Sequence, residues 1–169
     1  MTGERIYPPY LADERTNLEN WLEWQRATLA KKCAGLSAEQ LRKRSVAPSV
    51  MSLIGLVRHM AEVEHSWFQR CLAGKDEPLI YCTEEDPDAD FEGVDRADPE
   101  ADIQTWHDQC ALSRRTVSGL GSLDDAGTTR RSGDQVSARW VIVHMIEEYA
   151  RHNGHADLLR ERIDGKTGY

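Results

Sequence analysis

Residues 137–163, SARWVIVHMIEEYARHNGHADLLRERI, decide the fold, because they predict a long amphipathic helix with a carboxylate on its apolar side. Ser137 is a suitable N-cap, and apolar residues recur after it at intervals of three and four. At about 100° per residue, Glu148 and His152 fall about 40° apart and share the stripe that contains Val141. An ionised carboxylate on a core-facing stripe is costly unless a cation or hydrogen bonds compensate it. The segment therefore predicts a buried helix face and a charged group that needs a partner there.

Three more long helices are predicted upstream, each with its own start signal. Asp13 and Ser49 are suitable N-caps, and Asp98 is followed by Pro99, which is favoured at the first helical position. The predicted ranges are 13–33, 49–72 and 98–117. Four amphipathic helices without a convincing period-two stretch predict an all-α fold, an antiparallel-type four-helix bundle that occupies residues 1–169 as one domain.

The connecting segments are predicted from their composition. Ser37 and Gln40 form a capping-box pattern, which indicates one or two helical turns between the first two long helices. Residues 73–97 are polar and acidic, and residues 119–135 are rich in turn-forming residues. Both are expected to be loops, and whether the acidic part at 84–90 gates a pocket is open.

The composition excludes several classes of function. The chain has 29 Asp and Glu against 21 Lys and Arg, for a net charge of −8, which disfavours binding to nucleic acid or to anionic membranes. No signal-peptide pattern and no run of about 18 apolar residues is found, so a cytoplasmic location is expected. The four cysteines show no C-x-x-C spacing and are expected to be reduced, small core residues, none of them a nucleophile.

The spacing of Glu148 and His152 places two ligand types one helical turn apart. A third ligand is expected from the second long helix, where His59 lies at the edge of the apolar face while His65 falls far from it and should be exposed. Two histidines and a carboxylate with an open fourth position suit catalytic zinc, although nickel or another first-row divalent ion would accept the same set. The predicted metal ligands are therefore His59, Glu148 and His152.

Other polar and aromatic residues near this set receive more ordinary interpretations. His144 is expected to be partly buried and hydrogen-bonded, or else a substitute ligand, whereas His155 should line the pocket or orient a ligand. Glu64 is either an acceptor for a ligand histidine or the partner of a core Trp or Tyr, and His107 is expected at the surface. The five tryptophans are expected in the core, or by exception in a pocket wall: Trp21, Trp24, Trp67, Trp106 and Trp140.

Two stretches, SLIGLVRHMAEVEHSWF at 52–68 and WVIVHMIEEYARHNGHADLLRERIDG at 140–165, resemble the DinB-like superfamily of metal-binding bundles, in its actinobacterial branch. The resemblance implies a four-helix bundle with one metal ligand on the second helix and two ligands spaced by four on a later helix. Many members carry histidine at both later positions, but the mycothiol-dependent maleylpyruvate isomerase branch has glutamate at the first. This pattern maps onto His59, Glu148 and His152.

The resemblance also implies chemistry. Relatives use mycothiol or bacillithiol as cosubstrate, so a metal-dependent transferase that activates a small thiol for attack on an electrophile is expected. Arg151, Asn153, Asp157 and Arg160 flank the motif and could contact a polar thiol. The alternatives are a non-catalytic metal-binding, stress-associated bundle, a metal-dependent hydrolase and a thiol-dependent isomerase. The electrophile is open, and a homodimer through the first and last helices is an option.

Overall fold

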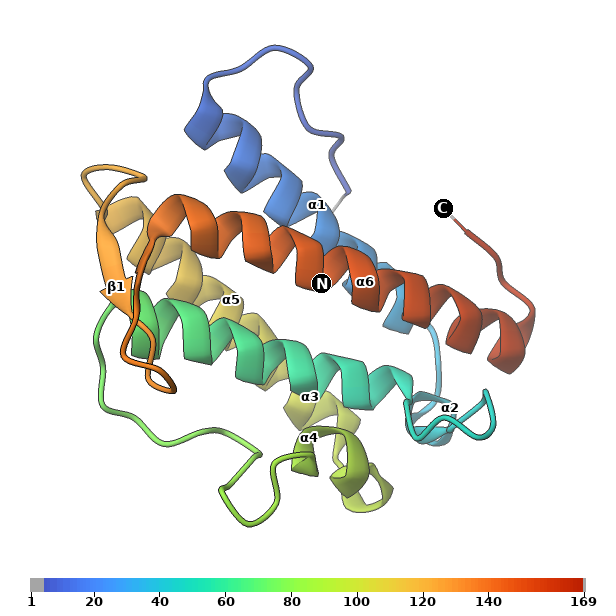
Figure 1. Cartoon of the computed structure of the whole chain (residues 1–169). Coiled ribbons are helices and arrows are strands. Elements are labelled where there is room, and N and C mark those ends of the chain that lie inside the picture. Colours follow the sequence, from blue (N-terminus) through green and yellow to red (C-terminus); the bar gives the residue numbers. More distant parts are fainter. Residues whose placement is uncertain (1–4, 169) are drawn as a thin grey trace.

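The long helices of the computed structural model, which describes residues 5–168, form a four-helix bundle (Figure 1). The third element, α3, continues directly into a π-helix, η1. The bounds are Glu14–Cys33 for α1, Leu53–Glu64 for α3, His65–Leu72 for η1, Pro99–Gly119 for α5 and Ala138–Asp164 for α6. Helix α1 packs mainly against α6, α3 packs mainly against α5, and α3 also contacts α6. The predicted all-α bundle is confirmed.

Most helix starts follow the predicted capping signals. Asp13, Asp98 and Ser137 each accept a backbone N–H of the first turn of α1, α5 and α6. Ser37 forms the predicted capping box at the start of α2, Ala38–Arg42. Such a cap contributes about 1 kcal/mol, because it satisfies donors that have no partner within the helix. Local sequence therefore places the long helices that carry the site.

Helix α3 begins later than predicted. Its N-cap is Ser52, whose hydroxyl oxygen accepts the N–H of Gly55 at 3.1 Å. The hydroxyl oxygen of Ser49, the predicted cap, instead accepts the N–H of Met51 at 3.2 Å. Ser49 is therefore occupied in a turn that precedes the helix, and the correction leaves His59 in the middle of α3.

The two predicted loops contain short elements, so the prediction of loops alone was wrong. Residues 73–97 include α4, Ala89–Glu92, and the 3-10 helix η2, Gly93–Arg96. Residues 119–135 include strand β1, Ala126–Thr128, and end at the start of its antiparallel partner β2, Gln135–Ser137. Elements of three or four residues are too short to show a periodic pattern in the sequence. They form because the surface onto which they dock stabilises them.

The strand pair docks closely on the end of η1. A Cβ atom added at Gly127 would lie 2.5 Å from the carbonyl oxygen of Cys71, so only glycine fits at this position. Strand β2 ends at Ser137, the N-cap of α6. The pair therefore connects the end of the second long helix to the start of the last one.

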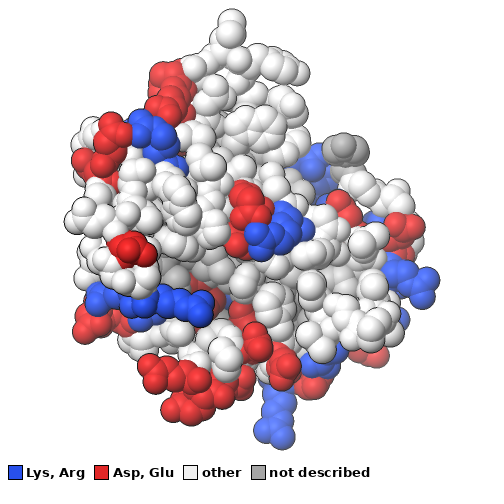
Figure 2. Space-filling model, in the orientation of Figure 1, with Lys and Arg blue, Asp and Glu red and all other residues white. Residues whose placement is uncertain are grey.

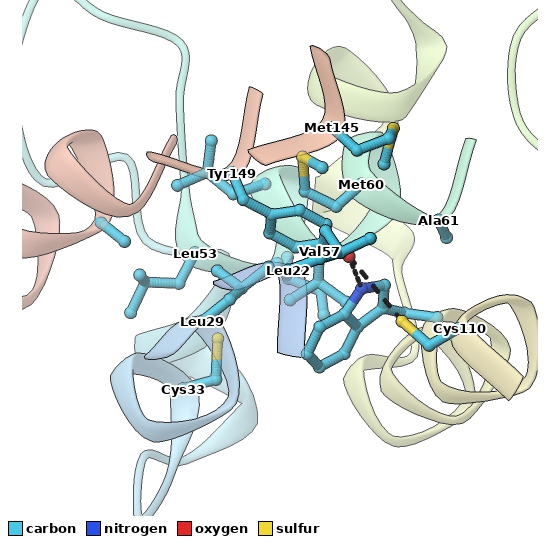
Figure 3. Close-up of a cluster of buried hydrophobic side chains, with 14 of the residues drawn as sticks. Leu22, Leu29, Cys33, Leu53, Val57, Met60, Ala61, Cys110, Met145 and Tyr149 are labelled. Atoms are coloured by element: carbon cyan, nitrogen blue, oxygen red, sulfur yellow. Dashed lines mark hydrogen bonds between the residues drawn. The ribbon is translucent and has the colours of Figure 1, made fainter. Parts of the chain in front are cut away.

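The core lies between the long helices and is mostly apolar (Figure 3). Of the tryptophans, Trp106 is buried at 2% exposure, but Trp140 is 48% exposed and Trp21, Trp24 and Trp67 are half-buried. The prediction that all five lie in the core was therefore right only for Trp106. Trp140 lies in the first turn of α6, where its ring packs against Trp67 at the rim of the bundle, with centroids 5.1 Å apart.

Charged side chains of both signs are scattered among uncharged ones on the face seen in Figure 2, and acidic side chains gather at its lower edge. The exposed acidic residues Glu84, Glu85, Asp86 and Asp88 belong to the segment that leads into α4. Among the described residues, no helix combines the length and the hydrophobicity that crossing a membrane requires.

Candidate metal centre

The three predicted ligands converge between α3 and α6. His59 on α3, Glu148 and His152 on α6 each offer a ligand atom, and these atoms all lie within 4.8 Å of one another. The rings of His59 and His152 have centroids 4.7 Å apart, and Nε2 of His152 lies 3.4 Å from a carboxylate oxygen of Glu148. His59 and Glu148 are 89 residues apart in the chain (148 − 59), yet their side chains face a common point with that of His152.

The protonation of this set suits a cation. Burial, followed by the neighbouring rings of His59 and His155, lowers the pKa of His152 to about 3. His152 is therefore neutral near pH 7, and a neutral imidazole has the lone pair that a metal ligand needs. The side chain of Glu148 is only 13% exposed, so its charge is partly removed from water. The donor set of two imidazoles and one carboxylate fits zinc.

The two remaining histidines of α6 lie beside the ligand set. His155 is half-buried, and its Nδ1 lies 3.3 Å from Nδ1 of His152. His144 is half-buried as predicted, stacks on Trp140, and has Nε2 3.8 Å from Glu148. His144 therefore lies beside Glu148 on the N-terminal side of the pair, and His155 lies beside His152 on its C-terminal side.

His144, Glu147 and Glu148 form a second group whose ligand atoms lie within 4.8 Å of one another. Arg151 donates a hydrogen bond to Glu147 and lies 3.5 Å from Glu148. The guanidinium group therefore already supplies a positive charge at this partly exposed cluster. The half-buried group with His59 and His152 is the better candidate for an ion.

Sequence reasoning missed Asp90 in α4. This carboxylate is buried at 4% exposure, and its Oδ2 lies 2.8 Å from Nδ1 of His59. Next to it, the ring of Phe91 stacks on His59, with centroids 4.7 Å apart. Asp90 lies in an acidic segment that has no periodic pattern, so nothing local distinguishes it from its exposed neighbours.

Two histidines lie elsewhere than predicted. His65 was expected to be exposed but is buried at 4% exposure, because the segment after η1 covers it and Nε2 lies 3.0 Å from the carbonyl oxygen of Pro78. His107 was expected at the surface but is half-buried against Trp106 on α5. Neither histidine belongs to the ligand set.

Of the two interpretations of Glu64, the structure shows the one with a core tyrosine. The Tyr149 hydroxyl donates to Glu64 at 2.7 Å, and Arg26 donates two hydrogen bonds to the same carboxylate. The hydroxyl also lies 3.7 Å from the sulfur of Cys110 (Figure 3). Glu64 is therefore part of a buried polar network in the core and is compensated there without a metal.

Two of the polar residues that flank the motif support the bundle. Asn153 donates two hydrogen bonds to Gln25 on α1, and Arg160 donates to the carbonyl oxygens of Lys32 and Ala34. These side chains tie α6 to α1 and are not free to bind a thiol. Asp157 forms an ion pair with Lys32 of α1. Of the four flanking residues, Arg151 is the exposed cation that lies beside Glu148.

The cysteines are free, and none of them is a thiolate near pH 7. Burial raises the pKa of Cys33 to about 12, and burial together with the charges of Asp90 and Glu62 raises that of Cys82 to about 11. Burial also raises the pKa of Cys71 and Cys110. Because the thiolate is the nucleophilic form, these cysteines are poor nucleophiles.

Comparison with known proteins shows the family to which the chain belongs. A family model described as mycothiol-S-transferase matches residues 17–165, which include all three predicted ligands. A conserved protein of Enterococcus faecalis, known from a crystal structure, is 16% identical with a TM-score of 0.65, and the match covers 92% of this chain and 100% of that chain. This likeness shows a shared fold, and no curated protein matches the chain. The chain therefore belongs to the mycothiol-S-transferase family, a DinB-like family of small-thiol transferases.

Proposed function

We propose that this protein is a metal-dependent thiol S-transferase in which His59, Glu148 and His152 hold a divalent ion, zinc in the first place. The observation that carries the proposal is the convergence of these three side chains from α3 and α6 on one half-buried point. Mycothiol is the proposed cosubstrate, because the family is named for this thiol. The second substrate is the electrophile that the thiol attacks.

Zinc with an open position would lower the pKa of a thiol that binds there, so that the sulfur is nucleophilic near pH 7. Two neutral imidazoles and one carboxylate leave one positive charge on such a site, which favours an anionic sulfur over a neutral one. His152 contributes by staying neutral, and Glu148 contributes the only negative charge of the set. The fold holds both residues on the rigid face of α6.

The proposed reaction is a simple exchange of bonds. A bond forms between the thiol sulfur and an electrophilic carbon, while the bond from that carbon to its leaving group breaks and its electron pair departs with the leaving group. The thiol proton is released to solvent. The raised pKa values of the cysteines keep them protonated near pH 7, so the attacking sulfur belongs to the cosubstrate.

The test combines metal analysis with a thiol-transfer assay. Wild-type protein loaded with zinc should bind about one ion per chain and should accelerate the loss of mycothiol together with monobromobimane. Glu148→Gln and His152→Ala should lose most of the metal and of the rate, because a site with two ligands is weak. His107→Ala is the control, since it removes a half-buried histidine that lies outside the ligand set.

Three results would count against the proposal. Equal zinc content in wild type and His152→Ala would show that His152 is not a ligand of the ion. Ester or amide hydrolysis without thiol would favour a hydrolase, because a metal-activated water needs no thiol. Tight zinc binding without any turnover of thiol and electrophile would favour a non-catalytic metal-binding bundle.

A further inference from the structure

A buried carboxylate lies directly behind the proposed ligand on α3. Oδ2 of Asp90 is 2.8 Å from Nδ1 of His59, and its other oxygen accepts the N–H of Phe91 at 2.9 Å. We propose that Asp90 is a positioning residue, which holds His59 with Nε2 free for the ion and so sets the affinity for metal. This inference rests on the proposed metal site.

The hydrogen bond selects one form of the imidazole. A neutral histidine carries one N–H and one lone pair, and a carboxylate accepts only from the nitrogen that carries the proton. Because Oδ2 of Asp90 faces Nδ1, an ionised Asp90 favours the tautomer with the proton of His59 on Nδ1 and the lone pair on Nε2. Ligand histidines commonly donate their second nitrogen to a carboxylate, which fixes the ring and makes it a better donor to the metal.

The same short helix restrains the ring from a second direction. Phe91 stacks on His59 with an interplanar angle of 28° and centroids 4.7 Å apart, and its centroid lies 6.3 Å from that of His152. The edge of the His59 ring is therefore held by Asp90, and one face is held by Phe91. Rotation of the ring about its side-chain bonds would break both contacts.

Helix α4 is held on α3 independently of the Asp90 side chain. Arg58 donates to the carbonyl oxygens of Ala89 and Asp90, at 3.0 Å each. One helical turn later, the buried carboxylate of Glu62 accepts the backbone N–H groups of residues 80–82 at distances of 2.7–3.1 Å. The segment therefore has anchors on α3 that do not involve the Asp90 carboxylate.

This division of roles makes the inference testable. If Asp90 served only to dock α4, its loss would lower stability and leave the preference of His59 between its two tautomers unchanged. If it positions His59, its loss changes the tautomer and the metal affinity, while α4 remains on α3 through Arg58. Asp88, which is exposed and forms no side-chain hydrogen bond at the start of α4, provides a control with the same change of charge.

The experiment compares wild type with Asp90→Ala, Asp90→Asn and Asp88→Ala. Zinc dissociation constants are measured by competition with a chelating dye, and the His59 tautomer is read from ¹⁵N chemical shifts of the metal-free proteins. Asp90→Ala should bind zinc about 10- to 100-fold more weakly and should lose the Nδ1–H tautomer. Asp90→Asn keeps an acceptor oxygen and should restore the tautomer with an intermediate affinity, whereas Asp88→Ala should match wild type.

The outcomes separate this inference from the proposed function. Unchanged zinc affinity in Asp90→Ala, or a proton on Nε2 of His59 in metal-free wild type, would overturn the role of Asp90 and leave the metal site standing. Failure of wild type to bind zinc would overturn both proposals. If Asp90→Ala does not fold, the comparison of Asp90→Asn with Asp88→Ala decides, because an affinity equal to that of Asp88→Ala and a proton on Nε2 would also overturn the inference.

Discussion

The buried ion pair between Arg26 and Glu64 leads to a quantitative prediction for the stability of the bundle. Glu64 is fully buried and Arg26 is 4% exposed, and Nε and Nη2 of Arg26 donate to the two carboxylate oxygens at 2.7 and 2.6 Å. Tyr149 donates a third hydrogen bond to Glu64 and accepts one from Nε1 of Trp106. Two charges are therefore removed from water in the core and compensate each other, while Nη1 of Arg26 also donates to Glu23, which has Arg114 as a second partner.

Removal of one charge should cost far more than removal of both. Arg26→Met leaves the carboxylate of Glu64 buried without its cation and should lower the free energy of unfolding by about 3–5 kcal/mol. Glu64→Leu leaves the buried guanidinium with only the partly exposed carboxylate of Glu23, so its loss should lie at the lower end of this range. For a chain of this size, this corresponds to a melting temperature lower by roughly 6–20 °C. The double variant contains no unpaired charge, and we expect it to be less destabilised than either single variant.

The assay is a double-mutant cycle in guanidinium chloride, with the four proteins free of metal. The coupling energy is the difference between the loss in the double variant and the sum of the losses in the single variants. A coupling of several kcal/mol in the favourable direction is expected. A coupling below about 0.5 kcal/mol, or single variants as stable as wild type, would show that the pair is not a mutually compensated buried ion pair.

Further predictions concern three other positions. Glu62→Ala removes the acceptor for the N–H groups of residues 80–82, so amide hydrogen exchange there should become faster, and slow exchange would contradict the anchoring role. Gly127→Ala should lower stability by about 1–3 kcal/mol in thermal melts because its Cβ would clash with the Cys71 carbonyl, whereas Gly119→Ala, which has open space, should not. Because the folded-state pKa of His152 is lowered, the unfolded chain binds a proton there first, so metal-free protein should lose stability as the pH falls from about 6.5 toward 3. His152→Gln should lose less stability over this pH range. A pH profile of stability identical to that of wild type would contradict the lowered pKa of His152.

Much of the candidate site could be predicted from the sequence because it lies on regular helices. The period of the last helix placed Glu148 and His152 on one face, and the cap at Ser137 fixed where that helix begins. The edge position of His59 on the apolar face of α3 was enough to select it as the third member of the set. Periodicity and capping act within a few residues, so they can be read from local sequence.

By itself, the sequence determined the long helices, their apolar faces and the convergence of the three proposed ligands. Only the tertiary structure decided the burial of His65, the exposure of Trp140 and the contact of Asp90 with His59. Each of these depends on how an irregular segment or a helix end lies against a distant helix. No periodic pattern records such a contact, because the residues that form it are far apart in the chain and the short segments take their shape from the surface onto which they dock.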